Sequence, residues 1–133
     1  MAEAFWVEIV AADRRVWEGE AISVVARTTE GDIGLLAHHE PMIAPLVAST
    51  AEVTTPDGRR EIVVVDGGFL SCTPTRVALI SPFAQLAHEI SLDEAEHELR
   101  DAQRALESGD NSEEVHRHYQ RAQAQIKAVH LVA

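Results

Sequence analysis

Seven histidines are the side chains that most readily suggest chemistry here, because imidazole binds transition metals and exchanges protons near neutral pH. Their spacing does not assemble a ligand set. His38 and His39 are adjacent, so in an extended chain they point in opposite directions. His116 and His118 are two apart, which on a helix separates them by roughly 200° around the axis. Around His97 we also expect no ligand pair one helical turn apart, so we predict no metal site and rank a histidine metalloenzyme last.

The other reactive side chains also lack the patterns that catalysis needs. Asp66 precedes Gly67 and Gly68, where an aspartate is more often a turn former than a catalytic carboxylate. Ser71 and Ser81 are not part of the Gly-x-Ser-x-Gly elbow that exposes a nucleophilic serine. We therefore predict no nucleophile, no acid–base pair and no bound cofactor, and a chain that is not an enzyme by itself.

The elements that could position a functional surface are organised around the stretch 31–42. Its glycines, Gly31 and Gly34, permit a sharp turn between short extended pieces. Apolar residues between and after them would anchor this turn, and Pro41 prevents a helix from continuing. The Gly-x-x-Gly spacing lacks the third glycine of a dinucleotide-binding loop, so alone it predicts no nucleotide site.

The composition excludes several classes of partner. The 133 residues include 11 Lys and Arg against 22 Asp and Glu, a net charge of −11, which repels nucleic acid and anionic lipid. Cys72 is the single cysteine, so no intramolecular disulfide can form. We expect no secretory signal and no membrane span, because the first residues lack a basic segment followed by a long apolar run. These features predict a cytoplasmic location.

Residues 5 to 83 show the pattern of short strands separated by Gly and Pro. Pro56-Asp57-Gly58 predicts a hairpin turn, because proline fixes φ and Asp-Gly suits positive φ. The run 21–29 alternates only in part, which is compatible with burial on both faces. Many short strands at regular spacing favour a β-sandwich over a barrel. The predicted strands are 6–11, 16–18, 21–29, 45–48, 51–55, 60–66, 69–73 and 75–81.

After residue 90 the spacing becomes helical. Ser91 with Glu94 forms a capping box, and Gly109 stands where a helix C-terminal cap is expected. Asn111 with Glu114 offers a second capping box. Two helices joined by so short a link should fold back as an antiparallel hairpin. The predicted apolar stripes are Leu92, Ala95, Leu99, Ala102 and Leu106 on the first helix, and Val115, Tyr119, Ala122, Ile126 and Val129 on the second.

The predicted hairpin is thermodynamically weak. Its stripes are rich in alanine, and an isolated helix pair that buries so little apolar area barely offsets its conformational entropy. It should pack on the sandwich, pack on another subunit or come loose, which is the precondition for a movable element. The basic residues Arg117, Arg121 and Lys127 of the second helix have two interpretations: they suit the helix dipole, or they meet an acidic surface of another protein.

Three sequence motifs occur in an order that is typical of one protein family. From Gly31 the chain follows Gly-x-Ile-Gly-hydrophobic-Leu-Pro-x-His-x-Pro-Leu, with Ala37 in place of the first proline and Met42 in place of the last leucine. Gly67-Gly68-Phe69-Leu70 is the second motif, and an Asp-Arg-x-hydrophobic-Trp-x-Gly turn begins at Asp13. With the helical tail, nearly the whole chain resembles the epsilon subunit of the rotary F-type ATP synthase, and the first twenty residues are most similar to actinobacterial members. The residues that match the first motif are Gly31, Ile33, Gly34, Leu36, His39 and Pro41.

The resemblance implies an N-terminal β-sandwich, residues 1–88, of about ten short strands in two five-stranded sheets. A C-terminal antiparallel two-helix hairpin, residues 89–133, would follow. The implied function is that of a non-catalytic central-stalk subunit of a proton-translocating synthase, which links the gamma subunit to the membrane ring of c-subunits. Such a subunit is peripheral at the cytoplasmic face of the cell membrane and associates with the membrane only through the complex.

The resemblance also implies two contact sites. Glu30, Asp32 and His39 match positions that face the polar loops of the c-ring, where the two acids would meet basic residues. In some members the hairpin extends into the alpha and beta catalytic subunits and inhibits ATP hydrolysis. Arg117, Arg121 and Lys127 would then contact those acidic subunits.

A third implied site is incomplete in this sequence. Some bacterial members bind ATP through Ile/Leu-Asp-x-x-Arg-Ala at the start of the hairpin. Leu92 and Asp93 keep the beginning of this motif, but Glu96 replaces the arginine and His97 the alanine. Because a carboxylate repels phosphate, we predict weak or absent ATP binding.

A function of a different class stays open at this point. The same pattern suits a free-standing β-sandwich adaptor whose helical tail docks a partner. Stoichiometric co-purification with gamma discriminates between the two interpretations.

Overall fold

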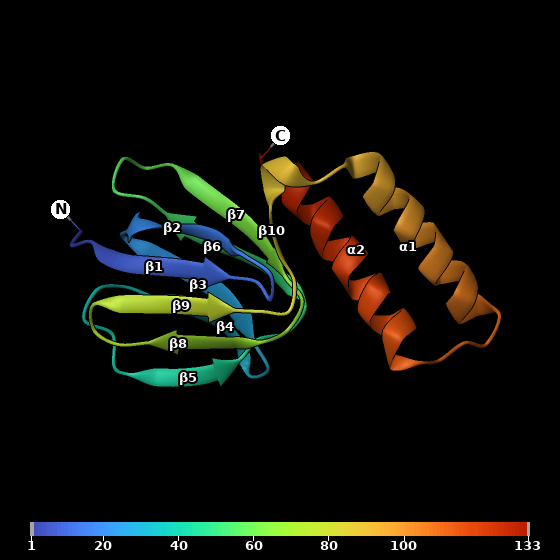
Figure 1. Cartoon of the computed structure of the whole chain (residues 1–133), viewed down its shortest axis with the longest axis horizontal. Helices are drawn as coiled ribbons and strands as arrows, with labels where there is room; N and C mark the ends of the chain where they lie inside the picture. The colour runs from blue at the N-terminus through green and yellow to red at the C-terminus, as the bar shows by residue number, and fades with distance from the viewer. Residues whose placement is uncertain (1, 133) are drawn as a thin grey trace.

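A computed structural model describes residues 2–132 and contains a β-sandwich followed by two helices (Figure 1). The ten strands form two five-stranded sheets, as expected. A 3₁₀ turn, η1 (Ala87–Glu89), connects them to the helices α1 (Leu92–Glu107) and α2 (Glu113–Val132). The strands are β1 (Phe5–Val10), β2 (Arg15–Ala21), β3 (Ser23–Thr28), β4 (Gly31–Leu35), β5 (Met42–Pro45), β6 (Ser49–Thr54), β7 (Arg60–Val65), β8 (Phe69–Cys72), β9 (Arg76–Ile80) and β10 (Ala84–Leu86).

The two sheets pack face to face around one apolar core. Sheet A has the strand order β2-β1-β9-β8-β5, and sheet B has the order β10-β7-β6-β3-β4. The β1–β9 pair is parallel, and the other pairs are antiparallel. Because side chains alternate along a strand, every second residue points between the sheets. The largest side chains that are fully buried there include Val7, Ile9, Leu35, Leu70 and Leu79.

The largest errors in the predicted strand boundaries concern edge strands. Strand β2 continues through Gly19 to Ala21, where a stop was predicted. Gly34 lies inside the regular strand β4, and of the two turn glycines only Gly31 has a positive φ. Strand β5 ends at Pro45, where a strand was predicted to begin, and β10 was not predicted. An edge strand has a partner on one side only, so it tolerates the Gly and Pro that indicate a stop elsewhere.

The strand that is covered on both faces is β7, not β3 as the partial alternation suggested. In β3, Val24 and Ala26 face the core, and the opposite face is exposed. In β7, residues 62–65 are all buried, because Ile62 and Val64 lie under α2 while their neighbours face the sandwich core. A continuous apolar run is expected where a sheet covers one face of a strand and a helix covers the other.

Both ends of α1 are capped at the predicted residues, but only half of the predicted capping box forms, since no hydrogen bond joins the Ser91 amide to the Glu94 carboxylate among the described residues. The Ser91 hydroxyl accepts a hydrogen bond from the Glu94 amide at 3.3 Å. At the other end Gly109 has a φ of 96°, and its amide and that of Asp110 donate to carbonyls of the last helical turn at 3.1 and 2.9 Å. This is the Schellman pattern, whose positive φ favours glycine.

The predicted capping box at the start of α2 is wrong. Ser112 is the capping residue, because its hydroxyl accepts a hydrogen bond from the Val115 amide at 3.3 Å. The side-chain oxygen of Asn111 lies 2.6 Å from the ring nitrogen of His116 instead. The cap is therefore one residue later than predicted.

Replacing Ser112 with Ala should destabilise the first turn of α2 by about 1 kcal/mol, because the Val115 amide loses its acceptor. The matched control, Asn111→Ala, removes only an exposed side-chain contact and should change the stability of the turn by less than about 0.5 kcal/mol. Amide hydrogen exchange in the first turn of α2 measures both effects. Equal effects of the two substitutions would contradict this capping assignment.

The hairpin packs on the sandwich through α2, which lies between α1 and the sheets (Figure 1). One face of α2 meets α1 along the predicted stripes, whose central residues Ala102 and Ala122 are buried. A second face, which was not predicted, packs on the outer face of sheet B at β6 and β7 and on η1. Within residues 2–132, no helix is long and apolar enough to cross a membrane. The residues of the second face are Arg121, Ala124, Gln125 and Ala128.

Candidate interaction surfaces

The outer face of sheet A carries an uncovered apolar patch. Ile43 on β5, Phe69 on β8 and Ile80 on β9 are 73%, 54% and 50% exposed. The strand register places Pro45, Phe69 and Ile80 side by side, and Ile43 lies two residues from Pro45 on the same face. We call Ile43, Pro45, Phe69 and Ile80 the sheet A patch. Clustered exposed apolar side chains mark surfaces that bind other proteins, and α2 covers the corresponding face of sheet B only at β6 and β7.

The turn between β3 and β4 presents Glu30 at an exposed tip. The Thr28 hydroxyl accepts a hydrogen bond from the Glu30 amide at 3.1 Å and donates one to the Gly31 carbonyl at 2.9 Å. These bonds fix the conformation of the turn, and the Glu30 side chain is exposed. Glu30 is therefore available to a partner.

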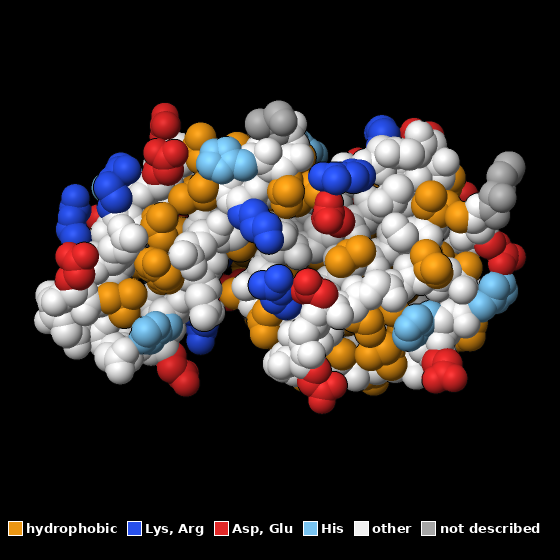
Figure 2. All heavy atoms as spheres, turned by 180° about the vertical axis from the view of Figure 1, so that it is seen from behind, with side chains coloured by type: hydrophobic (Ala, Val, Ile, Leu, Met, Phe, Trp, Pro, Cys, Tyr) orange, Lys and Arg blue, Asp and Glu red, His pale blue; other side chains and the backbone are white. Residues whose placement is uncertain are grey.

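Asp32, on the adjoining strand, already has a partner within the chain. The Nε of Arg27 donates to its carboxylate at 2.8 Å. This hydrogen bond and the charge of Arg27 lower the pKa of Asp32 below its ordinary value, and the charge of Lys127 lowers it further. All three residues line a groove of about 430 Å³ between sheet B and α2. Figure 2 shows this side of the molecule, where basic and acidic side chains lie next to each other beside the notch between the helices and the sandwich.

His39 lies apart from the two acidic residues. It is in the loop 36–41, where its Nδ1 lies 2.9 Å from the neighbouring backbone carbonyl and 3.7 Å from the sulfur of the buried Cys72. The turn with Glu30 precedes β4 and this loop follows it. The structure thus brings Glu30 and Asp32 to one end of β4 and His39 to the other.

Arg121 joins the hairpin to the sandwich. Its Nη1 lies 3.6 Å from Oδ2 of Asp66, and its guanidinium lies over the ring of Phe83, 4.8 Å from the centroid. The side chain of Arg121 is 21% exposed and that of Asp66 is 7% exposed. Asp66 does belong to a turn, since its amide donates to the hydroxyl of Ser81 and the carbonyl of Phe83 at 3.1 and 3.2 Å. Its role as the partner of α2 was missed, because the two residues are far apart in sequence.

The three basic residues that were predicted to act together are therefore not equivalent. Arg117 and Lys127 are exposed, whereas Arg121 is held against the sandwich. Arg117 also lines a groove with Asp66 at the same end of the interface. In this arrangement two of the three side chains are available to a partner.

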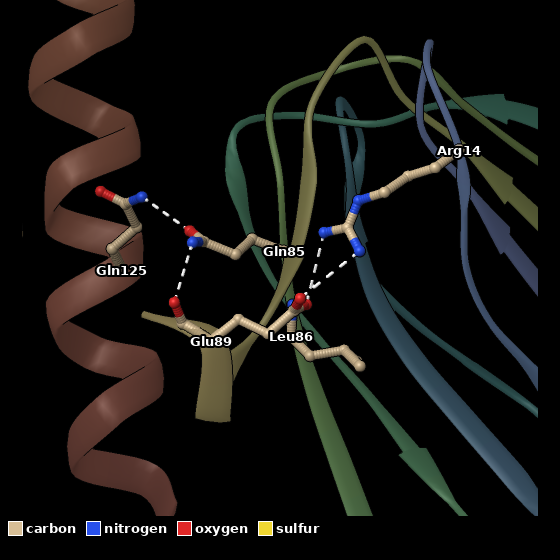
Figure 3. A network of polar contacts seen from close by, with 5 residues as sticks. All are labelled: Arg14, Gln85, Leu86, Glu89 and Gln125. Carbon is tan, nitrogen blue, oxygen red and sulfur yellow. Dashed lines mark hydrogen bonds and ion pairs between the residues drawn. The ribbon is translucent and has the colours of Figure 1, made fainter. Parts of the chain in front are cut away.

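A second set of polar contacts crosses the segment between the sandwich and the helices (Figure 3). Gln125 of α2 donates to the side-chain oxygen of Gln85 at 3.0 Å, and Gln85 donates to the carbonyl of Glu89 at 3.2 Å. The Glu89 carboxylate accepts the Leu86 amide at 3.1 Å and both terminal nitrogens of Arg14 at 3.4 Å. The network connects the β1–β2 turn, η1 and α2. The side-chain oxygen of Gln125 is buried without a partner among the described residues.

Glu89 makes the stability of this segment depend on pH. Burial alone would raise the pKa of Glu89, but the Leu86 amide and Arg14 outweigh it and lower this pKa. A folded-state pKa below the unfolded value means that the stabilisation is present above the unfolded pKa, about 4.3, and is lost as the pH falls through the folded pKa. Replacing Glu89 with Gln should therefore make the free energy of unfolding depend less on pH below about pH 5. Denaturant titrations at several pH values measure this, and identical pH dependence in both proteins would contradict it.

The residues of the incomplete ATP motif begin α1. Leu92 is half-buried in the first turn, while the side chains of Asp93 and His97 are exposed. The Nε2 of His97 lies 3.2 Å from the Asp101 carboxylate one turn later, so the expectation that no such pair exists around His97 is wrong. A pair alone is not a metal site. Among residues 2–132 no three His, Cys, Asp or Glu side chains are grouped so that they could hold a metal ion.

Comparison with known proteins shows which family the chain belongs to. A family model described as the ATP synthase, Delta/Epsilon chain, beta-sandwich domain matches residues 4–87, which is more than half of the chain. The chain belongs to the ATP synthase delta/epsilon chain family. The matched range ends at η1, so it contains both sheets and the sheet A patch.

Similar curated proteins extend the match through the helices. An ATP synthase epsilon chain of Streptomyces avermitilis is 42% identical and covers 97% of this chain and 98% of its own length. One of Rhodococcus jostii is 43% identical over 82% of this chain and 85% of its own length. The expected similarity to actinobacterial epsilon chains is confirmed.

A solved structure supports the fold. A chain in the cryo-EM structure of Euglena gracilis mitochondrial ATP synthase, described as OSCP/F1/c-ring in rotational state 1, superposes with a TM-score of 0.76. It is 21% identical and the match covers 97% of this chain and 81% of that one. This likeness shows that the sandwich and the hairpin share one overall architecture with that chain.

Proposed function

We propose that the chain is a rotor subunit of the central stalk of a proton-translocating F-type ATP synthase, with no active site of its own. The sandwich connects the gamma subunit to the c-ring, and the hairpin restrains ATP hydrolysis. The division lies at residues 1–88 and 89–133, whose outermost residues, Met1 and Ala133, are outside the described range. The subunit is peripheral at the cytoplasmic face of the cell membrane and is held there through the complex.

The uncovered sheet A patch is the observation that supports the contact with gamma. Both outer faces of the sandwich carry apolar side chains, but on sheet B the apolar residues Ile62 and Val64 of β7 lie under α2. The sheet A patch leaves Ile43, Phe69 and Ile80 in water, which costs free energy unless a partner covers them. A permanent partner with an apolar surface suits it best, and we assign this role to gamma.

The c-ring contact is supported by the β3–β4 turn. Glu30 at its tip is exposed and can pair with a basic loop of the ring. Asp32 contributes less, because Arg27 already neutralises it. His39, at the far end of β4, would contact the ring at a second point next to the exposed Leu36.

Restraint of hydrolysis requires that the hairpin leave the sandwich and enter the alpha and beta subunits. The exposed Arg117 and Lys127 would meet acidic surfaces there, and Arg121 would join them after release from Asp66. Replacing all three by Ala in the complex should raise hydrolysis. Unchanged hydrolysis would exclude this role for them.

ATP itself should bind weakly. Glu96 stands where the family motif has its phosphate-facing arginine, and Asp93 adds a second negative charge nearby. We expect a dissociation constant for ATP above about 1 mM in calorimetric titration of the isolated chain, equivalent to less than about 4 kcal/mol of binding free energy. Sub-millimolar affinity would contradict this prediction.

Reconstitution with gamma tests the proposal as a whole. The chain and gamma, expressed together, should purify as an equimolar complex that also binds isolated c-ring. A folded chain that leaves gamma unbound would exclude the rotor function. The same result would favour the alternative, a free-standing β-sandwich adaptor whose helical tail docks a different partner.

A further inference from the structure

The interface between the hairpin and the sandwich lacks large apolar side chains on the helix side. Helix α2 contributes Ala124 and Ala128, which pack on Ile62 and Val64 of β7 and on Ala87 of η1. Each alanine buries one methyl group, so this contact stabilises the docked hairpin less than leucine or phenylalanine would. The position of the hairpin therefore depends strongly on the few polar contacts at its edge.

Among residues 2–132, Arg121 and Asp66 form the one ion pair that joins α1 or α2 to the sandwich, and Asp66 lies in the turn after β7. The Asp66 side chain is almost fully buried, and the guanidinium also lies over the ring of Phe83. A cation over an aromatic ring is stabilised further when water is partly excluded. Because Asp66 and Phe83 both belong to the sandwich side, both contacts hold Arg121 to the sandwich.

We propose that Arg121, Asp66 and Phe83 are a latch that holds the hairpin against the sandwich. While Asp66 is paired with the guanidinium of Arg121, this guanidinium is not free to bind an acidic surface of another protein. Release of the hairpin frees Arg121 at the same moment as the exposed Arg117 and Lys127 move away from the sheet. The latch itself concerns the isolated chain, and only its consequence for hydrolysis rests on the proposed function.

Gln125 both supports and opposes docking: its side-chain nitrogen donates a hydrogen bond to Gln85, but its side-chain oxygen has no partner within residues 2–132. The side-chain oxygen of Gln125 is buried without a partner among the described residues, which costs free energy in the docked state. Solvation of this oxygen favours release. By contrast, loss of Arg121 or Asp66 leaves a partly buried charge without its partner in the docked state, so either loss should shift the equilibrium toward release.

Amide hydrogen exchange of the full chain tests the latch directly. Asp66→Asn should accelerate exchange of the α2 amides about tenfold, equivalent to about 1.4 kcal/mol, while β1 and β9 stay as in the unmodified chain. The matched control is Asp101→Asn, which removes the same charge from an exposed ion pair on α1 and should change α2 exchange less than twofold. If Asp66→Asn leaves α2 exchange within twofold of the unmodified chain, the latch does not exist.

Arg121→Gln keeps the test decisive if Asp66→Asn disturbs the sandwich, because it changes only the helix. It should accelerate α2 exchange as Asp66→Asn does, and the double variant should exchange no faster than either single variant. If the acceleration of α2 exchange in the double variant equals the product of the two single accelerations, the residues act separately and the proposal is overturned. Fast α2 exchange in Asp66→Asn, combined with unaltered hydrolysis in the complex, would retain the latch and exclude the inhibitory function.

Discussion

Replacing Ile43 and Phe69 together with Asp should weaken binding to gamma at least ~100-fold, equivalent to about 2.8 kcal/mol. Both side chains are largely exposed and lie on adjacent strands, so each substitution would place a charge in the middle of the contact. A buried charge without a partner is costly at an interface. Calorimetry or surface immobilisation of gamma measures the change.

The control for this prediction is Val132→Asp. Val132 is 53% exposed, close to the value for Phe69, but it lies on α2 and away from sheet A. It should alter gamma binding less than twofold. The double variant should also keep its thermal unfolding temperature, because neither side chain belongs to the core. Unchanged gamma binding in a folded double variant would show that the sheet A patch is not the gamma contact.

Gly68→Ala should lower the free energy of unfolding by about 3 kcal/mol or more. Gly68 has a φ of 95°, which is strained for alanine. An added Cβ would also lie 2.0 Å from the Ile80 carbonyl oxygen and 2.7 Å from the Cα of Ser81. These are backbone atoms of the adjacent strand end, so they cannot move aside without disturbing sheet A.

Gly34→Ala is the matched control for this substitution. Gly34 lies on the edge strand β4, and nothing lies within 4 Å of an added Cβ. Alanine should leave stability unchanged or raise it by up to about 1 kcal/mol, because it restricts the unfolded chain. Chemical denaturation measures both variants. A loss at Gly34 as large as that at Gly68 would contradict the structural interpretation of the two glycines.

The fold could be predicted from the sequence wherever local chemistry decides it. The capping hydroxyl of Ser91, the C-terminal Gly109 and the Asp57-Gly58 turn each act within a few residues, and the structure confirms all three. The apolar stripes between α1 and α2 also follow from helical spacing alone. The edge strands could not be predicted, because one unpaired side lets glycine and proline stay within a strand.

The functional surfaces depend on contacts between distant parts of the chain, and the sequence contains little signal for them. The sequence around Asp66 indicates only a turn, and the sequence around its partner Arg121 indicates only a helix with basic residues. The sheet A patch had a weak signal, since Phe69 and Ile80 are apolar at positions that alternate with core residues. Which sheet is covered by α2 depends on the fold as a whole.

The most direct measurement of the central claim is ATP hydrolysis by a catalytic assembly depleted of its epsilon subunit. Full-length chain and a version ending at residue 88 are added separately, and gamma binding is recorded with hydrolysis. We predict that both bind gamma and that only the full-length chain slows hydrolysis, because the sandwich provides attachment and the hairpin provides restraint. Failure of the full-length chain to bind gamma would contradict the assignment as a rotor subunit, and equal hydrolysis with both versions would contradict the role of the hairpin.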